Sequence, residues 1–123
     1  MLNPRIATYR LQLGPAFDFD QACAIIPYLT QLGISHLYLS PCLQAAKDST
    51  HGYDVVDPLH VSNELGGEEA FAKLCLAAKS AGLAVMLDVV PNHLSIETDE
   101  NPWWQSVLEN GPSSKYAHYF NVD

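Results

Sequence analysis

The sequence predicts a parallel α/β fold, because strand-like and helix-like segments alternate along it, with a glycine at each return from helix to strand. Three segments have the apolar pattern of strands, namely residues 6–13, 34–39 and 83–90. Two segments have the apolar spacing of helices, namely residues 18–32 and 68–81. Gly33 and Gly82 follow these helices and are typical helix ends. This order is characteristic of a parallel sheet whose strands are joined by helices.

Local signals mark the first strand and the first helix. Apolar and polar side chains alternate between residues 6 and 13, and a Gly-Pro pair ends the segment. Asp18, followed three positions later by Gln21, forms a capping box at the start of the helix. Pro27 lies inside this helix and lacks a backbone donor, so we expect a kink there or a helix that starts later.

A long connection follows the second strand. Residues 41–67 are rich in Pro, Gly, Asp, His and Ser, and we expect no regular element within them. This connection exceeds the usual length of roughly 2 to 6 residues, and loops of such length are often functional.

The helix at residues 68–81 and the strand at residues 83–90 complete the alternation. The strand is nearly all apolar, as expected of a parallel strand that helices cover on both faces. Beyond it, Asn101 before Pro102 has the pattern of a helix N-cap followed by proline in the first turn. This pattern predicts a short helix that ends near Glu109.

Composition limits the classes of function. The 123 residues, 48% of them apolar, are enough for one modest core, and so for one domain or part of one. A net charge of -8 repels phosphate backbones and anionic lipids, so we expect no nucleic acid partner and no membrane partner. Neither a membrane-spanning run nor a signal peptide is expected from the apolar pattern. Three widely spaced cysteines predict reduced thiols in a cytoplasmic protein.

Polar residues gather just after the second and third strands, where parallel α/β enzymes place their active sites. Asp88 is a carboxylate inside an apolar run, so it requires a hydrogen-bond or charge partner, and an arginine from elsewhere would suit it. His93 lies at the mouth of the same strand. From the residues alone, a turn-capping role for Asp88 and a surface position for His93 are as well supported as a functional role.

A second polar cluster lies at residues 49–58, inside the long connection. His51, Tyr53, Asp54 and Asp57 combine aromatic, imidazole and carboxylate groups, a composition that suits a carbohydrate. The alternative is a tyrosine packed on the rim of the fold and aspartates that form turns.

Metal ions, nucleotides and other cofactors are not expected. The candidate metal ligands have no recognised spacing: His51, Asp54, Asp57, His60, Asp88 and His93. Gly66 and Gly67 precede a helix but lack the Lys and Ser or Thr of a phosphate loop, and no serine or cysteine lies in a nucleophile elbow.

The string Asp88-Val89-Val90-Pro91-Asn92-His93 resembles the first signature region of the α-amylase family, glycoside hydrolase family 13. Further segments resemble, in order, a branch of that family that rearranges α-1,4-glucans: residues 8–13, 38–41, 49–58, 64–67, 101–104 and 108–114. The resemblance implies the first three βα units of a (β/α)8 TIM barrel, with the barrel incomplete. Residues 1–95 would form the amino-terminal part of the catalytic barrel, and residues 96–123 the start of a subdomain inserted after strand three.

The resemblance also implies roles for individual residues. Tyr53 matches a tyrosine that stacks under the sugar ring where the bond breaks, and His93, joined by His51, matches a histidine that binds hydroxyls of that sugar. Asp88 matches a carboxylate that pairs with an arginine on a later strand, and Asp54 completes the expected substrate-binding set. Asn92 matches a calcium ligand of some members, but this branch implies no required metal.

The resemblance places no catalytic residue within this chain. The nucleophilic Asp, the acid/base Glu and a further Asp belong after the fourth, fifth and seventh strands, so the 123 residues alone are expected to be inactive and to need the remainder of the barrel. The implied reaction converts the reducing-end α-1,4 linkage of a maltooligosaccharide or α-1,4-glucan into an α,α-1,1 linkage. The alternatives are a hydrolase of the same family and a non-catalytic α/β sugar-binding domain.

Overall fold

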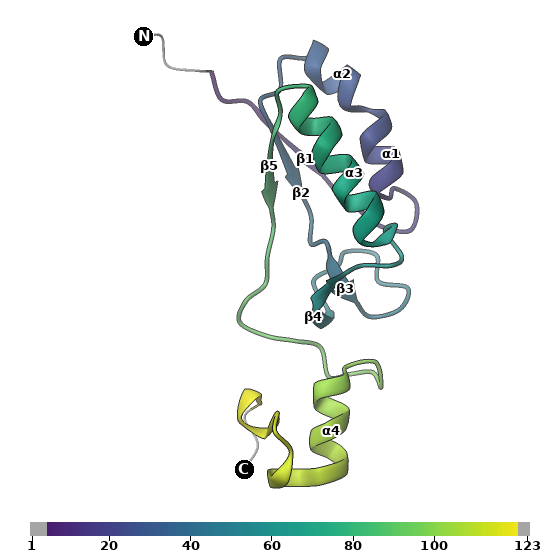
Figure 1. Cartoon of the computed structure of the whole chain (residues 1–123), viewed down its shortest axis with the longest axis vertical. Helices are drawn as coiled ribbons and strands as arrows, with labels where there is room; N and C mark the ends of the chain where they lie inside the picture. Colours follow the sequence, from purple (N-terminus) through teal and green to yellow (C-terminus); the bar gives the residue numbers. More distant parts are fainter. Residues whose placement is uncertain (1–4, 121–123) are drawn as a thin grey trace.

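Three parallel strands form the main sheet of the computed structural model, which describes residues 5–120. The strands are β1 (Thr8–Leu11), β2 (His36–Leu39) and β5 (Ala84–Leu87), in the order β1-β2-β5 (Figure 1). Both strand pairs are parallel, and their last residues lie in register, so the three carboxyl ends are level with one another. The predicted parallel α/β arrangement is confirmed.

The predicted first helix is divided in two at Pro27. The two parts are α1 (Phe19–Ala24) and α2 (Ile26–Gln31), and the proline lies in the first turn of α2, where its missing donor costs nothing. The predicted kink is therefore confirmed. The capping box is also present, because Gln21 N donates to Asp18 Oδ1 at 3.0 Å and Asp18 N donates to Gln21 Oε1 at 2.8 Å.

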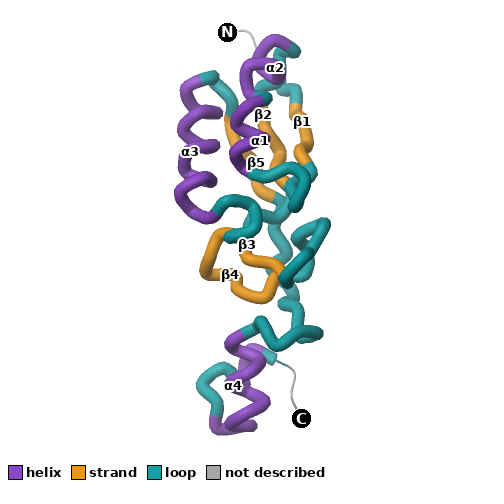
Figure 2. The backbone as a smooth tube through the Cα atoms, turned by 90° about the vertical axis from the view of Figure 1, so that its right-hand side faces the viewer, coloured by secondary structure: helices purple, strands orange, loops and turns teal. Residues whose placement is uncertain are grey.

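The core lies between the sheet and α1, α2 and α3 (Gly67–Ser80), which cover one face of the sheet (Figure 2). Leu37 and Leu39 of the central strand are fully buried. In contrast, Met86 and Leu87 of β5 are 45% and 46% exposed. The expectation that helices cover residues 83–90 on both faces is wrong for this chain, because the helices that pack on the sheet within residues 5–120 all lie on one face.

An antiparallel hairpin occupies part of the long connection. Its strands are β3 (Leu43–Ala45) and β4 (Val55–Val61), so the expectation of no regular element between residues 41 and 67 is wrong. Val55 and Val56 are β-branched and almost fully buried, which favours a strand. Pro58 is tolerated because β4 pairs with β3 alone, and the two register shifts in this pair relax its ladder.

The last helix, α4 (Pro102–Asn110), begins and ends where the sequence predicts. It lies at the end of the molecule, beyond the hairpin (Figure 1). Asn101 is fully buried, and its Oδ1 accepts from the backbone nitrogens of Trp103 and Trp104 at 3.0 and 3.1 Å. Its Nδ2 donates to the carbonyl of Ser95 at 3.0 Å. No helix within residues 5–120 is long and apolar enough to cross a membrane.

Replacement of Asn101 tests this cap. Asn101→Ala removes both functions of the side chain, and loss of a cap typically costs about 1 kcal/mol. Asn101→Asp keeps the acceptor for the helix and loses only the donor to Ser95. Hydrogen exchange of the Trp103 and Trp104 amides in the complete polypeptide should be faster in Asn101→Ala than in Asn101→Asp. Equal protection in the two variants would show that the cap does not hold the helix.

Candidate active-site face

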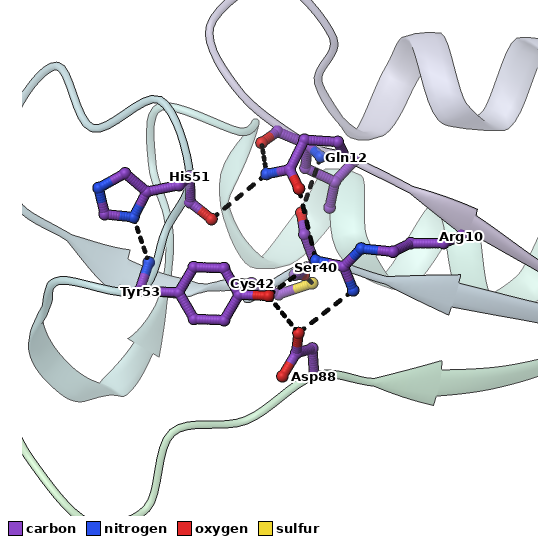
Figure 3. Close-up of polar contacts among 8 residues, drawn as sticks. Arg10, Gln12, Ser40, Cys42, His51, Tyr53 and Asp88 are labelled. Carbon is purple, nitrogen blue, oxygen red and sulfur yellow. Dashed lines mark hydrogen bonds and ion pairs between the residues drawn. The ribbon is translucent and has the colours of Figure 1, made fainter.

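Candidate site side chains meet at the carboxyl ends of the three parallel strands. Arg10 comes from β1, and Asp88 directly follows β5, where its backbone nitrogen donates to the carbonyl of Leu39 at 2.9 Å. Tyr53 comes from the loop before β4 and approaches Asp88 from the side opposite to Arg10 (Figure 3). Segments that are distant in the sequence therefore converge on one point.

One hydrogen-bonded cluster joins these three side chains. The Tyr53 hydroxyl donates to Asp88 Oδ2 at 2.5 Å. Arg10 Nη2 donates to the Tyr53 hydroxyl oxygen at 2.8 Å, and Arg10 Nη1 donates to Asp88 Oδ2 at 3.2 Å (Figure 3). The guanidinium also lies over the ring of Tyr38, 4.8 Å from its centroid.

The cluster shifts the proton affinities of its members in opposite directions. The hydrogen bond from Tyr53, followed by the contacts of Arg10, lowers the pKa of Asp88 below its ordinary value. The same hydrogen bond raises the pKa of Tyr53. Near neutral pH, Asp88 is therefore a carboxylate and Tyr53 is a neutral phenol that donates to it.

The arginine that pairs with Asp88 in this chain comes from the first strand and not from a later one. The requirement for a charge partner was predictable because Asp88 lies inside an apolar run of the sequence. Arg10 carried no such signal, because it lies 78 residues away and a whole strand, β2, separates the two strands that supply the pair. Gln12, whose amide contacts Arg10 and the next loop, was missed for the same reason.

The loop that carries Tyr53 is tied by its own polar groups. Ser49 Oγ donates to Asp54 Oδ1 at 2.5 Å and accepts from Gly52 N at 3.1 Å. The backbone nitrogen of Tyr53 donates to His51 Nδ1 at 3.0 Å, and the two rings are stacked with centroids 6.0 Å apart. The turn-forming interpretation of Asp54 thus has direct support.

Tyr53 and His93 line the same cleft, which has a volume of about 360 Å³. His51 and Asp54 also line it, together with three residues of the segment after β5: Leu94, Ser95 and Glu97. A hydrogen bond of 2.7 Å from Ser95 N to the carbonyl of Val55 holds this segment beside the loop. Four of the five predicted site residues thus share one cleft, and Asp88 contacts it through Tyr53. Their roles toward a sugar stay predictions.

A larger cleft adjoins the first through His93. Its volume is about 770 Å³, and it is lined by residues 89–94, by Ile96 and by aromatic residues that include Trp103, His118, Tyr119 and Phe120. Trp103 stacks on Tyr116 at 5.6 Å, and Trp104 packs on Phe120 at 5.1 Å without lining the cleft.

Other reactive groups are already engaged. Asp57 accepts from Leu59 N at 3.0 Å and contacts His60 Nδ1 at 2.7 Å. These bonds are local, as a turn-forming aspartate would make them, but the residue lies inside strand β4 and not in a turn. Cys42 lies beside Ser40 at the strand ends (Figure 3), and burial raises the pKa of its thiol to about 12, so the thiol stays protonated. Across residues 5–120, no three side chains of His, Cys, Asp or Glu gather in a way that could hold a metal ion.

A family profile described as "Alpha amylase, catalytic domain" matches residues 18–123. The chain belongs to the α-amylase family. Its three parallel strands and covering helices are therefore the first units of the (β/α)8 barrel of that family, without closure of the barrel in this chain. The predicted fold class and family are both confirmed.

Known members of the α-amylase family differ in how similar they are to this chain. "Putative maltooligosyl trehalose synthase" of Mycobacterium tuberculosis is 47% identical over 100% of this chain and 17% of its own length. An intracellular maltogenic amylase of Bacillus subtilis is 34% identical over 79% of this chain and 16% of its own length. The chain thus spans about a sixth of these curated relatives.

The solved structures show the same order of similarity, with a maltooligosyltrehalose synthase more similar to this chain than a debranching enzyme. The maltooligosyltrehalose synthase of Arthrobacter ramosus superimposes with a TM-score of 0.93 at 46% identity, over 97% of this chain and 16% of the other. A debranching enzyme of Nostoc punctiforme gives a TM-score of 0.74 at 34% identity, over 85% of this chain and 21% of the other.

Gly52 offers a test of how the loop positions Tyr53. Its φ is 81°, and a Cβ at this position would lie 2.9 Å from the carbonyl oxygen of Pro41. Gly52→Ala must therefore displace the loop, and we expect the free energy of unfolding of the complete polypeptide to fall by about 2 kcal/mol or more. Gly33→Ala is the matched control, because Gly33 has a φ of 79° with nothing within 4 Å. Equal losses in both variants would mean that general backbone strain, and not loop position, causes the effect.

Proposed function

We propose that the complete polypeptide containing this chain is a maltooligosyl trehalose synthase. It would convert the reducing-end α-1,4 linkage of a maltooligosaccharide into the α,α-1,1 linkage of a terminal trehalose unit. The observation that carries the proposal is the convergence of Tyr53 and His93 on one cleft beside an ionised Asp88. The higher identity to synthases, 47% against 34% for a maltogenic amylase, favours rearrangement over hydrolysis.

The chemistry of the cleft suits one glucose unit. The Tyr53 ring offers an apolar face to a sugar, while its hydroxyl is held away in the bond to Asp88. His93 and His51 line the same cleft and supply ring nitrogens for sugar hydroxyls. Asp54 lines it as well, although one of its oxygens is held by Ser49.

The three aspartates at this face are poor candidates for nucleophile or acid/base. Asp88 Oδ2 already accepts from both Tyr53 and Arg10. Asp54 is engaged by Ser49 of its own loop, and Asp57 is engaged by neighbouring residues of β4. The nucleophile and the acid/base would therefore come from the chain that completes the barrel, which is the further partner that this segment needs.

The proposed reaction is retaining. A carboxylate of the complete enzyme forms a covalent glycosyl ester, and the released glucose stays bound instead of leaving. The anomeric hydroxyl of that glucose then attacks the ester and forms the α,α-1,1 bond. Because water would hydrolyse the same ester, the site must exclude it during the transfer.

We further propose that residues 1–95 belong to the barrel and residues 96–123 begin a subdomain inserted after strand three. The contacts that support a defined junction are those of Glu100, whose two carboxylate oxygens accept from Lys47 N at 3.0 Å each. Reduced Cys23, Cys42 and Cys75 support a cytoplasmic location.

Product analysis tests the proposed function. The complete polypeptide is incubated with maltopentaose, and the products are separated by chromatography. We expect an isomer of unchanged mass that has lost its reducing end, whereas glucose and shorter maltooligosaccharides as the main products would assign a hydrolase instead. The isolated 123-residue chain serves as the control and should show no turnover.

Trp103 and Trp104 form a matched pair for the exclusion of water. Trp103 lines the larger cleft, as His93 does, whereas Trp104 does not line it and packs on Phe120 of its wall. Trp103→Ala should raise the hydrolysed fraction of product about tenfold in the complete polypeptide, because water gains access to the ester. Trp104→Ala should change this fraction much less. An unchanged fraction in Trp103→Ala would show that this tryptophan only packs against its neighbours.

A further inference from the structure

We propose that Arg10 is a positioning residue that fixes the aromatic platform of the sugar site. It acts by holding the Tyr53 hydroxyl and the Asp88 carboxylate together across the ends of the sheet, without contacting the sugar itself. The inference rests on the proposed function in one respect, namely that Tyr53 is the platform on which the sugar stacks.

The geometry requires a forked cation. Two different nitrogens of Arg10 reach two different acceptors, with Nη2 at 2.8 Å from the Tyr53 hydroxyl and Nη1 at 3.2 Å from Asp88 Oδ2. The planar guanidinium places two donors side by side, whereas a lysine ammonium is a single point charge on a flexible stem. A lysine here could keep the charge but could not keep both contacts in the same geometry.

Arg10 is itself held in place. Its guanidinium lies over the Tyr38 ring on the neighbouring strand, and its Nη2 contacts Gln12 Oε1 at 3.4 Å. Gln12 in turn donates from Nε2 to the carbonyl of His51 at 3.4 Å. Arg10 of β1 and Gln12, the residue after β1, thus both reach the loop that carries Tyr53. Sites supported by strands are positioned more accurately than sites supported by loops alone.

Without Arg10, the platform keeps only one of its two polar anchors. The Tyr53 hydroxyl would still donate to Asp88, but nothing would fix the side chain from the direction of β1. The charge of Asp88 would also lose its cationic neighbour. The ionisable groups that bear on Asp88 are Arg10 from β1, Tyr38 from β2 and Tyr53 from the loop.

A double-mutant cycle in the complete polypeptide tests whether Arg10 acts through Tyr53. We expect Arg10→Gln to lower kcat for maltopentaose by about tenfold or more, with a smaller change in KM. In the Tyr53→Phe background, which keeps the ring but has no hydroxyl to hold, the same change should cost less than about threefold. Equal fold-changes in both backgrounds would overturn the proposal. Arg5→Gln, at the other arginine of the chain, is the matched control and should leave kcat unchanged.

The pH profile separates this role from a purely structural one. Arg10 helps to lower the pKa of Asp88, so its removal raises that pKa toward the ordinary value. The ionised cluster is then lost at a higher pH as the solution is acidified, and the acid limb of kcat/KM should move upward in Arg10→Gln. Arg10→Lys keeps the positive charge, so it should restore the acid limb while recovering only part of kcat. An acid limb that does not move in Arg10→Gln would contradict the proposal.

A spectroscopic measurement keeps this inference distinct from the proposed function. The tyrosine rings are labelled with ¹³C in the complete polypeptide, and the Tyr53 signal is assigned by its absence in Tyr53→Phe. It should shift in Arg10→Gln and stay in place in Arg5→Gln. If the Tyr53 signal shifts but maltopentaose is not rearranged, the contact of Arg10 stands and the proposed function fails. If maltopentaose is rearranged but the Tyr53 signal does not move, the positioning role of Arg10 fails alone.

Discussion

The hydrogen bond between the Tyr53 hydroxyl and Asp88 is the interaction on which the arrangement of the site depends. It joins a loop that precedes β4 to the residue that follows β5, across 35 positions of sequence. The bond joins a neutral phenol to an ionised carboxylate, and it lowers the pKa of Asp88 and raises the pKa of Tyr53. Arg10 adds a third anchor from the first strand, so all three parts of the chain at this face are connected.

The sheet supplies the frame for this connection. Because β1, β2 and β5 are parallel and level at their carboxyl ends, side chains from separate strands emerge at the same height. The fully buried leucines of β2 fix the centre of the sheet against the helices. The outer strand β5 is much less covered, and its exposed Met86 and Leu87 match a strand that has neighbours on both sides in a closed barrel.

Local signals in the sequence predicted most of the fold, because they act over a few residues. The capping box at Asp18, the break at Pro27 and the cap at Asn101 each concern neighbouring backbone groups, and all three are present in the structure. The hairpin was missed because β3 has only 3 residues and β4 contains Pro58, a residue type typical of turns. The burial of Val55 and Val56 results from packing that the local pattern does not contain.

The site was predictable only in part, for a similar reason. An aspartate in an apolar run requires a partner, and this requirement is visible in the sequence. The identity of the partner depends on the order of the strands in the sheet, which places Arg10 of β1 near the carboxyl end of β5. The cleft shared by Tyr53 and His93 follows from the resemblance to the α-amylase family, since nothing in the local pattern relates these two residues.

The anchoring of the Tyr53 loop has a consequence for the thermodynamics of recognition. The loop is bonded internally through Ser49, to the segment after the first strand through Gln12 and to the sheet end through Asp88. A molecule that stacks on this ring therefore meets a surface that folding has already immobilised. Binding therefore costs little further conformational entropy of the loop. A mobile loop would have to be ordered on binding, and that entropic cost would reduce the affinity.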